Sequence, residues 1–277
     1  MTRGGEAVGP AMENGTVDFQ KGGKPSVEGK TWPWHQVLLE KALFSTLSYV
    51  PCGFRSKVMG LATGTRGSNV VFRNAEEPQK VALTIDDAPS KSTDHFRRLL
   101  DVLSDLRVKV TFQVISGHAS SEEHLALLRR AVAEGHQLTN HSTEDAKCTG
   151  LSEADFEARL DSCQAFLDQL SPRSRRWFRP PMGVMDAAMR RVLVRKGYSV
   201  CLGDCYSSDP HVNGVEYHVR TLLRGAKGGS VMILHCPEAT CRQQTLDVVP
   251  KVVEGLRARG FELVTLDELF PQHQQPC

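Results

Sequence analysis

Aromatic residues and net charge are both scarce in this chain. Only 6 % of its 277 residues are aromatic, and the formal net charge at pH 7 is +2. A nucleic acid or an anionic membrane is therefore not an expected partner, because such partners select a strongly basic surface. The richest basic stretch contains Arg173, Arg175, Arg176 and Arg179. We interpret its first three members as a solvated loop, because no aromatic platform accompanies them.

The cysteines lack the spacing of a zinc site, and the apolar runs lack the length of a membrane span. The eight cysteines include no Cys-x-x-Cys pair, and a domain of this length does not need disulfides, so we expect mostly reduced thiols. Zinc ligation by Cys236 and Cys241 is disfavoured because the usual two-plus-two spacing is missing. The N-terminus has no apolar core of the signal-peptide type, and the apolar segment 37–50 is too short to span a bilayer. The default expectation is a cytoplasmic protein.

The composition is otherwise that of a globular protein, with 40 % hydrophobic and 24 % charged residues. Residues 1–30 are rich in Gly, with several Glu and Lys and few large apolar residues, which favours disorder. Residues 31–78 are expected to form a helical extension, since the apolar residues between Leu38 and Leu47 share one helical stripe. We interpret this stripe as a packing surface rather than a membrane-surface anchor, because its polar face carries little positive charge.

From Lys80 onward, short β-rich runs alternate with amphipathic stretches, which predicts a main domain over 79–270 and a tail at 271–277. This order implies parallel strands covered by helices. About seven such units fit a closed or nearly closed α/β barrel better than two separate domains. The strands are expected at 81–85, 108–115, 136–140, 177–179, 198–202, 230–234 and 261–266. Helices are expected at 93–106, at 121–134, behind a capping box at Ser152 and Asp155, and before Gly197 and Gly260.

Two groups of polar residues follow predicted strands in the first half of this domain. Asp86 and Asp87 end an apolar run, and two adjacent carboxylates repel unless a positive group lies beside them. Their alternative interpretation is a helix N-cap. His141 and Asp145 are four residues apart, so a single helical turn would let both chelate one ion. A lone histidine after a strand is more often a hydrogen-bonded structural residue, so that alternative also stays open.

Similar residues follow the later strands. Arg179 leaves its strand in a stiff frame set by two prolines and Gly183, which suits bidentate pairing with a carboxylate. The alternative is an ordinary surface arginine. His235 ends the apolar run 231–234 and would emerge into a cleft. Beside a carboxylate such as Asp209, its imidazole could hold a proton at neutral pH, as a general acid must.

In their order along the chain, these residues resemble the polysaccharide deacetylases that share the NodB homology domain, carbohydrate esterase family four. The resemblance covers roughly residues 80–270 and implies a distorted (β/α) barrel. The run TIDD at 84–87 looks like the family's Thr-Phe-Asp-Asp motif, which implies that Asp86 is the catalytic base and Asp87 a metal ligand. The run HSTED at 141–145 looks like the metal motif His-Ser/Thr-x-x-His, which implies His141 and Asp145 as further ligands.

The resemblance also assigns roles in the second half of the domain. The run RPPMG at 179–183 is similar to the Arg-x-Pro-x-Gly motif, whose arginine holds the catalytic base, here Arg179. His235 stands where the family has the general acid of its Leu-x-His motif. Asp209 stands at the family's Asp-Trp motif and is expected to tune this histidine. The substrate-binding residues implied in this way are Pro181, Met182 and Ile233.

Three positions depart from the family pattern. Asp145 replaces the second metal-binding histidine, Pro210 replaces a groove tryptophan and Ile233 replaces a pocket leucine. Pro210 removes a sugar-stacking surface, so binding of a long polymer is not expected. With Asp87 and a neutral His141, Asp145 would balance the charge of a divalent ion. We therefore expect a harder, less Lewis-acidic site that binds Zn²⁺ and tolerates Mn²⁺ or Co²⁺.

The implied activity is that of a metal-dependent hydrolase that removes acetyl groups from an N-acetylated, chitin-like carbohydrate. Two alternatives remain open. One is an amide hydrolase acting on a small non-sugar substrate, and the other is a non-catalytic carbohydrate-binding relative. The acid, base and arginine favour an enzyme, because binding alone requires none of them.

Overall fold

The computed structural model describes residues 26–27, 30–31, 69–172 and 175–272. The chain divides into two compact units, Met1–Leu43 and Phe44–Cys277. In the described part of the first unit, two short strands, β1 (Ser26–Val27) and β2 (Lys30–Thr31), form an antiparallel pair. Most of the helical extension that we expected over residues 31–78 lies outside the described residues.

The described part of the second unit is built on one sheet of nine strands, and every ladder between these strands is parallel. From one edge the order is β3, β8, β7, β6, β5, β4, β10 and β9, while β11 pairs with β4. The strands are β3 (Val70–Val71), β4 (Lys80–Ala88), β5 (Thr111–Val114), β6 (Gln137–Asn140), β7 (Trp177–Phe178), β8 (Ser199–Cys201), β9 (Cys205–Tyr206), β10 (Val231–His235) and β11 (Glu262–Val264).

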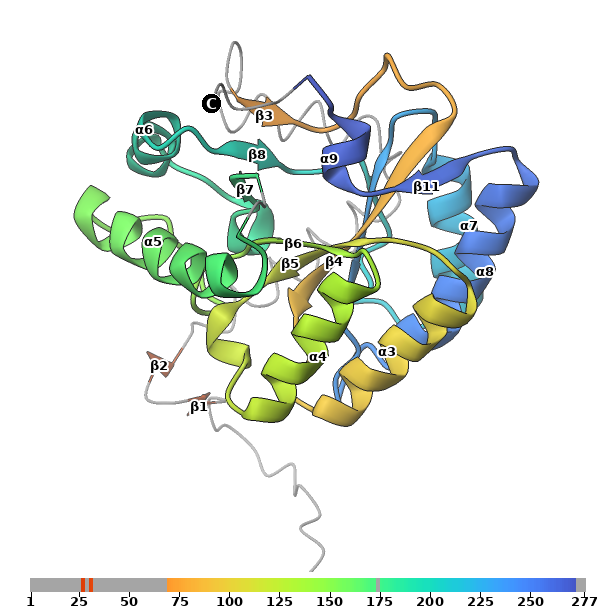
Figure 1. Ribbon diagram of the computed structural model, residues 1–277, viewed down its shortest axis with the longest axis horizontal. Helices are drawn as coiled ribbons and strands as arrows, with labels where there is room; N and C mark the ends of the chain where they lie inside the picture. The colour runs from red at the N-terminus through yellow and green to blue at the C-terminus, as the bar shows by residue number, and fades with distance from the viewer. Residues whose placement is uncertain (1–25, 28–29, 32–68, 173–174, 273–277) are drawn as a thin grey trace, which may run out of the picture. The chain divides into compact units, whose positions relative to one another are not determined.

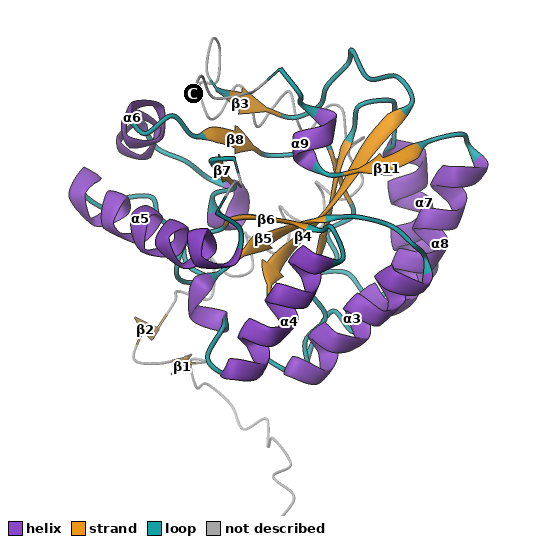
Figure 2. Cartoon of the chain, viewed as in Figure 1, coloured by secondary structure: helices purple, strands orange, loops and turns teal. Residues whose placement is uncertain are grey.

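Helices connect these parallel strands and cover the outside of the curved sheet (Figure 1, Figure 2). Leucine, valine and phenylalanine side chains of the helices and of the outward strand positions form the largest core cluster. Such crossover helices are what parallel strands require. The covering helices are α3 (Thr93–Asp105), α4 (Glu122–Ala133), α5 (Glu153–Leu170), α6 (Ala187–Arg195), α7 (Val215–Gly225) and α8 (Thr245–Ala258), and a short helix, α9 (Leu266–Leu269), follows the last strand.

The alternation of side chains along β4 separates the outer core from the barrel interior. Val81, Leu83 and Ile85 belong to the outer core, and Thr84 and Asp86 lie at the intervening positions. At the start of the strands the interior is apolar, because Ala82, Trp177, Val231 and the side chains of α9 pack together there. The interior therefore changes from apolar to polar toward the carboxyl ends of the strands.

The expected distorted barrel of parallel strands and covering helices is confirmed, and the strand and helix positions agree with the sequence pattern to within a few residues. Two strands of the nine-stranded sheet were missed. β9 has only two residues, and β3 pairs with β8, so the sheet begins before the expected domain start at residue 79. In the described part of the chain, no helix is both long and apolar enough to cross a membrane.

Candidate active site

Most of the polar residues singled out in the sequence meet at one edge of the barrel, and Asp145 is the exception. Asp86 and Asp87 lie near the carboxyl end of β4, and His235 is the final residue of β10. His141 directly follows β6 and Arg179 directly follows β7. Because all of these strands are parallel, their carboxyl ends lie on the same side, which is where active sites of α/β barrels form.

Asp86 is held by Arg179 inside the barrel, and both side chains are buried. Nη1 of Arg179 donates to Oδ1 of Asp86 and, at 2.8 Å, to the hydroxyl of Thr84. Its Nε donates to the carbonyl oxygen of Cys201 at 2.8 Å. The guanidinium thus divides its donors among three partners, instead of the bidentate pairing that we expected. Burial lowers the pKa of Arg179, but the charge of Asp86, the Cys201 side chain and the hydrogen bonds to these two residues together outweigh burial and raise it, so the arginine stays cationic.

Asp87 faces His141 instead of sharing the partners of Asp86. Its backbone has a φ of 61°, and β4 changes register between Ile85 and Ala88, so a bulge turns this carboxylate toward the site. Oδ1 of Asp87 lies 3.4 Å from Nε2 of His141. The expected alternative of a helix N-cap is wrong for both aspartates, since α3 begins at Thr93 behind Ser92.

His141 has the orientation of a metal-binding histidine. Its Nδ1 lies 2.6 Å from the carbonyl oxygen of Arg179 and donates a hydrogen bond to it, so Nε2 is the ring nitrogen that faces Asp87 and that would bind an ion in its deprotonated form. Two ligands at about 2.1 Å from a tetrahedral ion lie about 3.4 Å apart. The observed separation of Nε2 and the Asp87 oxygen is also 3.4 Å, so these two groups fit a divalent ion.

The structure does not bring Asp145 to this pair. The expected helical turn is not formed, because residues 143–146 are bends and Asp145 is exposed. Among the described residues, no group of three His, Cys, Asp or Glu side chains is arranged to hold a metal ion. This also applies to Cys236 and Cys241, which are free thiols, one buried and one exposed. The single-turn geometry was wrong, because local hydrogen bonds such as that from the Ser142 amide to Asn140 bend the chain first.

Arg242 is the residue of this site that the sequence did not indicate. It lies in the loop between β10 and α8, and its Nη1 donates to Oδ2 of Asp87. Only 11 % of its side chain is exposed. Burial raises the pKa of Asp87, but the hydrogen bond from His141 and the charges of His235, His141 and Arg242 outweigh it and hold this pKa well below its usual range. A lone arginine in a polar loop carries no periodic signal, so nothing in the sequence could have identified it.

His235 is paired with Asp209, as the sequence predicts. Nδ1 of His235 lies 3.1 Å from Oδ1 of Asp209, and its backbone N–H donates to Oδ2 at 2.9 Å. Burial lowers the pKa of His235, but the charge and hydrogen bond of Asp209, followed by the charges of Asp87 and Asp86, raise it to about 9. The imidazole is therefore protonated at neutral pH and carries a proton that it can donate.

The expected substrate-binding residues differ in how far their side chains are exposed. Pro181 is buried, Ile233 is half-buried, and Met182 is 55 % exposed with a φ of 60°. An aromatic ring that we did not predict lies nearby, since the ring centroids of Tyr206 and His235 are 5.9 Å apart. Tyr206 thus supplies an aromatic face four residues before Pro210, which stands at the family's tryptophan position.

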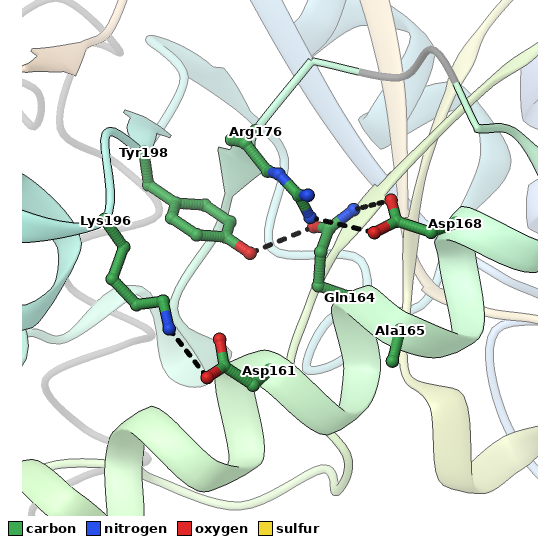
Figure 3. Close-up of a pocket in the computed structure, with 7 residues that line it drawn as sticks. All are labelled: Asp161, Gln164, Ala165, Asp168, Arg176, Lys196 and Tyr198. Atoms are coloured by element: carbon green, nitrogen blue, oxygen red, sulfur yellow. Dashed lines mark hydrogen bonds and ion pairs between the residues drawn. The ribbon is translucent and has the colours of Figure 1, made fainter.

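A cavity of about 310 Å³ lies elsewhere, against α5 and the start of β7 (Figure 3). Its charged residues are paired with each other, as in the contacts of Lys196 with Asp161 at 2.6 Å and of Arg176 with Asp168 at 3.2 Å. Arg176 precedes β7, so the cavity is at the opposite end of that strand from Arg179. These self-paired charges do not resemble an acid–base site.

Comparison with known proteins gives consistent matches. The family model described as polysaccharide deacetylase matches residues 73–201. The bifunctional xylanase/deacetylase of Pseudobutyrivibrio xylanivorans is 25 % identical over 213 residues, covering 77 % of this chain and 34 % of that protein. The chain thus spans about a third of the length of this relative. The chitooligosaccharide deacetylase of Rhizobium leguminosarum bv. trifolii is 29 % identical over 217 residues, covering 73 % of this chain and 97 % of that protein.

Among solved structures, the chain is similar to a family 4 acetyl xylan esterase from Clostridium thermocellum in complex with a cobalt ion. The TM-score is 0.63 at 26 % sequence identity, and the match covers 70 % of this chain and 91 % of that one.

Proposed function

The chain belongs to the polysaccharide deacetylase family, and from this premise we propose that it hydrolyses the acetamide group of an N-acetylated carbohydrate, releasing acetate and a free amine. The observation that carries the proposal is the pairing of β10 with β4, in which His235 and Asp86 are direct partners. A base held by Arg179 and an acid held by Asp209 therefore lie side by side in the barrel interior. Both roles in amide hydrolysis are then available from adjacent strands.

In this proposal a divalent ion would be held by Asp87 and His141, while Asp145, which is exposed, does not join them as the expected third ligand. Zn²⁺ is the expected ion, and Co²⁺ or Mn²⁺ would be tolerated by such a nitrogen and oxygen donor set. The cobalt ion in the similar esterase supports this choice. When bound, the ion would lower the pKa of a water molecule and polarise the amide carbonyl.

The chain's own residues perform the proton transfers. Asp86 accepts the proton of the attacking water, and Arg179 keeps Asp86 oriented. His235 donates its proton to the departing amine nitrogen, and Asp209 keeps this histidine protonated until then. We propose that the backbone N–H of Met182 donates a hydrogen bond to the oxyanion that forms at the amide carbonyl oxygen.

The proposed substrate is a short acetylated oligosaccharide instead of a long polymer. Pro210 offers no stacking surface, while Tyr206 lies beside His235 and provides one ring for a single sugar unit. One sugar ring stacked near the acid would orient its acetamide without an extended groove.

The test is acetate release from acetylated chito-oligosaccharides, peptidoglycan fragments and small amides, each with added Zn²⁺, Co²⁺ or Mn²⁺. Asp86→Asn and His235→Ala should each lose about 10²–10⁴-fold in kcat, the range of general acid–base catalysis. Glu254→Gln on the exposed face of α8 is the matched control and should leave turnover unchanged. Near-normal turnover in either site variant would refute the assigned roles.

The exposed Asp145 favours a second candidate, a carbohydrate-binding relative without activity. The same panel separates the two. Saturable oligosaccharide binding without acetate release under every metal condition would support the non-catalytic protein, and turnover confined to small amides would support a different amide hydrolase.

A further inference from the structure

The loop that carries Arg242 is fixed on both sides before it reaches the site. The Lys91 amide donates to the Glu238 carboxylate at 2.9 Å, and the Glu238 amide donates to the Cys241 carbonyl oxygen at 2.9 Å. The amide of Thr245 donates to the carbonyl oxygen of Arg242 at 3.0 Å. Arg242 itself has a φ of 59°, in the left-handed region that residues other than glycine rarely adopt. The backbone thus holds this arginine in an uncommon conformation that directs it inward.

The guanidinium of Arg242 supplies the partner for the second oxygen of the Asp87 carboxylate. Oδ1 of Asp87 faces His141 and Oδ2 accepts from Arg242, so both oxygens are engaged. The Nε of Arg242 is buried and has no hydrogen-bond partner among the described residues. Burying Arg242 with one unused donor costs free energy. Leaving the buried Asp87 carboxylate without a counter-charge would cost more, so the charge of Arg242 is what keeps the guanidinium in this position.

A divalent ion and Arg242 would serve the same carboxylate. An ion between Oδ1 of Asp87 and His141 would add two positive charges beside a carboxylate whose other oxygen, Oδ2, already accepts from the guanidinium. Like charges this close repel, and a carboxylate that gives one oxygen to an ion attracts the arginine less strongly.

We propose that Arg242 is a built-in counter-cation that neutralises Asp87 in the metal-free protein and competes with the divalent ion for this carboxylate. The inference rests on the proposed metal-binding role of Asp87 and His141. It makes the metal affinity weaker than the ligands alone would give, and it makes ion binding and displacement of Arg242 a single coupled event.

The test is calorimetric titration of the full chain with Co²⁺ and Zn²⁺ after chelator treatment. Arg242→Gln should bind either ion at least ten-fold more tightly than the unchanged protein, which corresponds to about 1.4 kcal/mol. Arg242→Lys keeps the charge on a shorter donor and should lie between the two. Arg220→Gln, which removes one positive charge from the exposed surface of α7, is the matched control and should bind as the unchanged protein does.

Thermal unfolding supplies a second readout that does not depend on activity. In chelator, Arg242→Gln should unfold at a lower temperature than the unchanged protein, because the Asp87 carboxylate has lost its counter-charge. Saturating Co²⁺ should remove this difference. If Arg242→Gln does not fold without metal, it is purified with Co²⁺, and Arg242→Lys carries the chelator comparison.

Equal affinity in all four proteins would overturn the role of Arg242 and leave the metal site standing. Metal binding that persists undiminished in Asp87→Asn would place the ion elsewhere and overturn the inference as well. If neither the unchanged protein nor Arg242→Gln binds an ion, the inference falls together with the metal requirement. Acetate release still judges the hydrolase proposal separately.

Discussion

Asp86 and Asp87 are neighbours in the chain, yet their carboxylates serve different partners. Strand alternation alone would send them to opposite faces of β4. The bulge before Ala88 and the positive φ of Asp87 instead keep Asp86 with Arg179 and turn Asp87 toward His141 and Arg242. Each carboxylate thus has its own cation, which removes the repulsion that two adjacent buried charges would otherwise cause.

His235 gives a prediction about pH. Its pKa of about 9 lies above the ordinary value near 6.5, so the protonated acid is lost only as pH rises through about 9, and activity should fall over the same range. By linkage, the stability that protonated His235 contributes to the metal-free protein is fully present below about pH 6.5 and is lost as pH rises through about 9.

The variant Asp209→Asn tests the cause of this shift. Removing the charge that raises the pKa of His235 most should move the alkaline limb of the pH–rate profile to lower pH by about one unit or more. The measurement is kcat/KM against pH for both proteins. An alkaline limb that stays in place would show that His235 is not the acid or that Asp209 does not control it.

At the scale of elements, β10 must be placed accurately because it carries His235. Its first residues are fixed by Asp204, which accepts from the Ser230 hydroxyl at 3.1 Å and the Val231 amide at 3.0 Å. Just before them, Gly229 has a φ of 80° and packs against the backbone of Asn74. A side chain cannot be accommodated at this crossing.

Gly229→Ala should therefore destabilise the protein by about 3 kcal/mol, since it adds a steric clash to the cost of a left-handed alanine. The added Cβ would lie 1.6 Å from the carbonyl oxygen of Asn74. Gly260→Ala is the matched control, because Gly260 has a φ of 81° but open space around it; it should lose only about 1 kcal/mol. Urea unfolding measures both, and equal losses would contradict the packing argument.

At the scale of the whole molecule, the apolar residues that stabilise the barrel lie at one end and the residues of the candidate active site lie at the other. Its start is filled by the apolar cluster around Trp177 and Phe270, whose ring centroids are 5.5 Å apart. Its other end carries the charged site. A defect in the apolar end should therefore weaken folding without changing the geometry of the site.

Phe270→Ala should lower the free energy of unfolding by about 3–5 kcal/mol, as large-to-small changes at buried aromatic positions do. Phe270 is 2 % exposed, whereas Val194 on α6 is 59 % exposed. Val194→Ala should change stability by no more than about 0.5 kcal/mol. Metal affinity measured well below the unfolding temperature should be unchanged in both, and a large loss of affinity in Phe270→Ala would show that the two ends are coupled.

The alternation of strands and helices was predictable because each element has its own period of apolar residues. Phe96, Leu99 and Leu103 predicted α3, and Ser152 was recognised as the N-cap of α5, where its hydroxyl accepts from the Asp155 amide. The two-residue strands β3 and β9 were missed, because two residues show no period. They form only through pairing with β8 and β10.

The sequence by itself determined the barrel and the positions of Asp86, Asp87, His141, Arg179 and His235, because residues that follow parallel strands must gather at one edge. Only the tertiary structure decided how the loops between these strands fold. It turned Asp145 outward and brought Arg242 to Asp87 across 155 positions of the chain. Loop conformations depend on contacts between distant segments and leave no repeating pattern in the sequence.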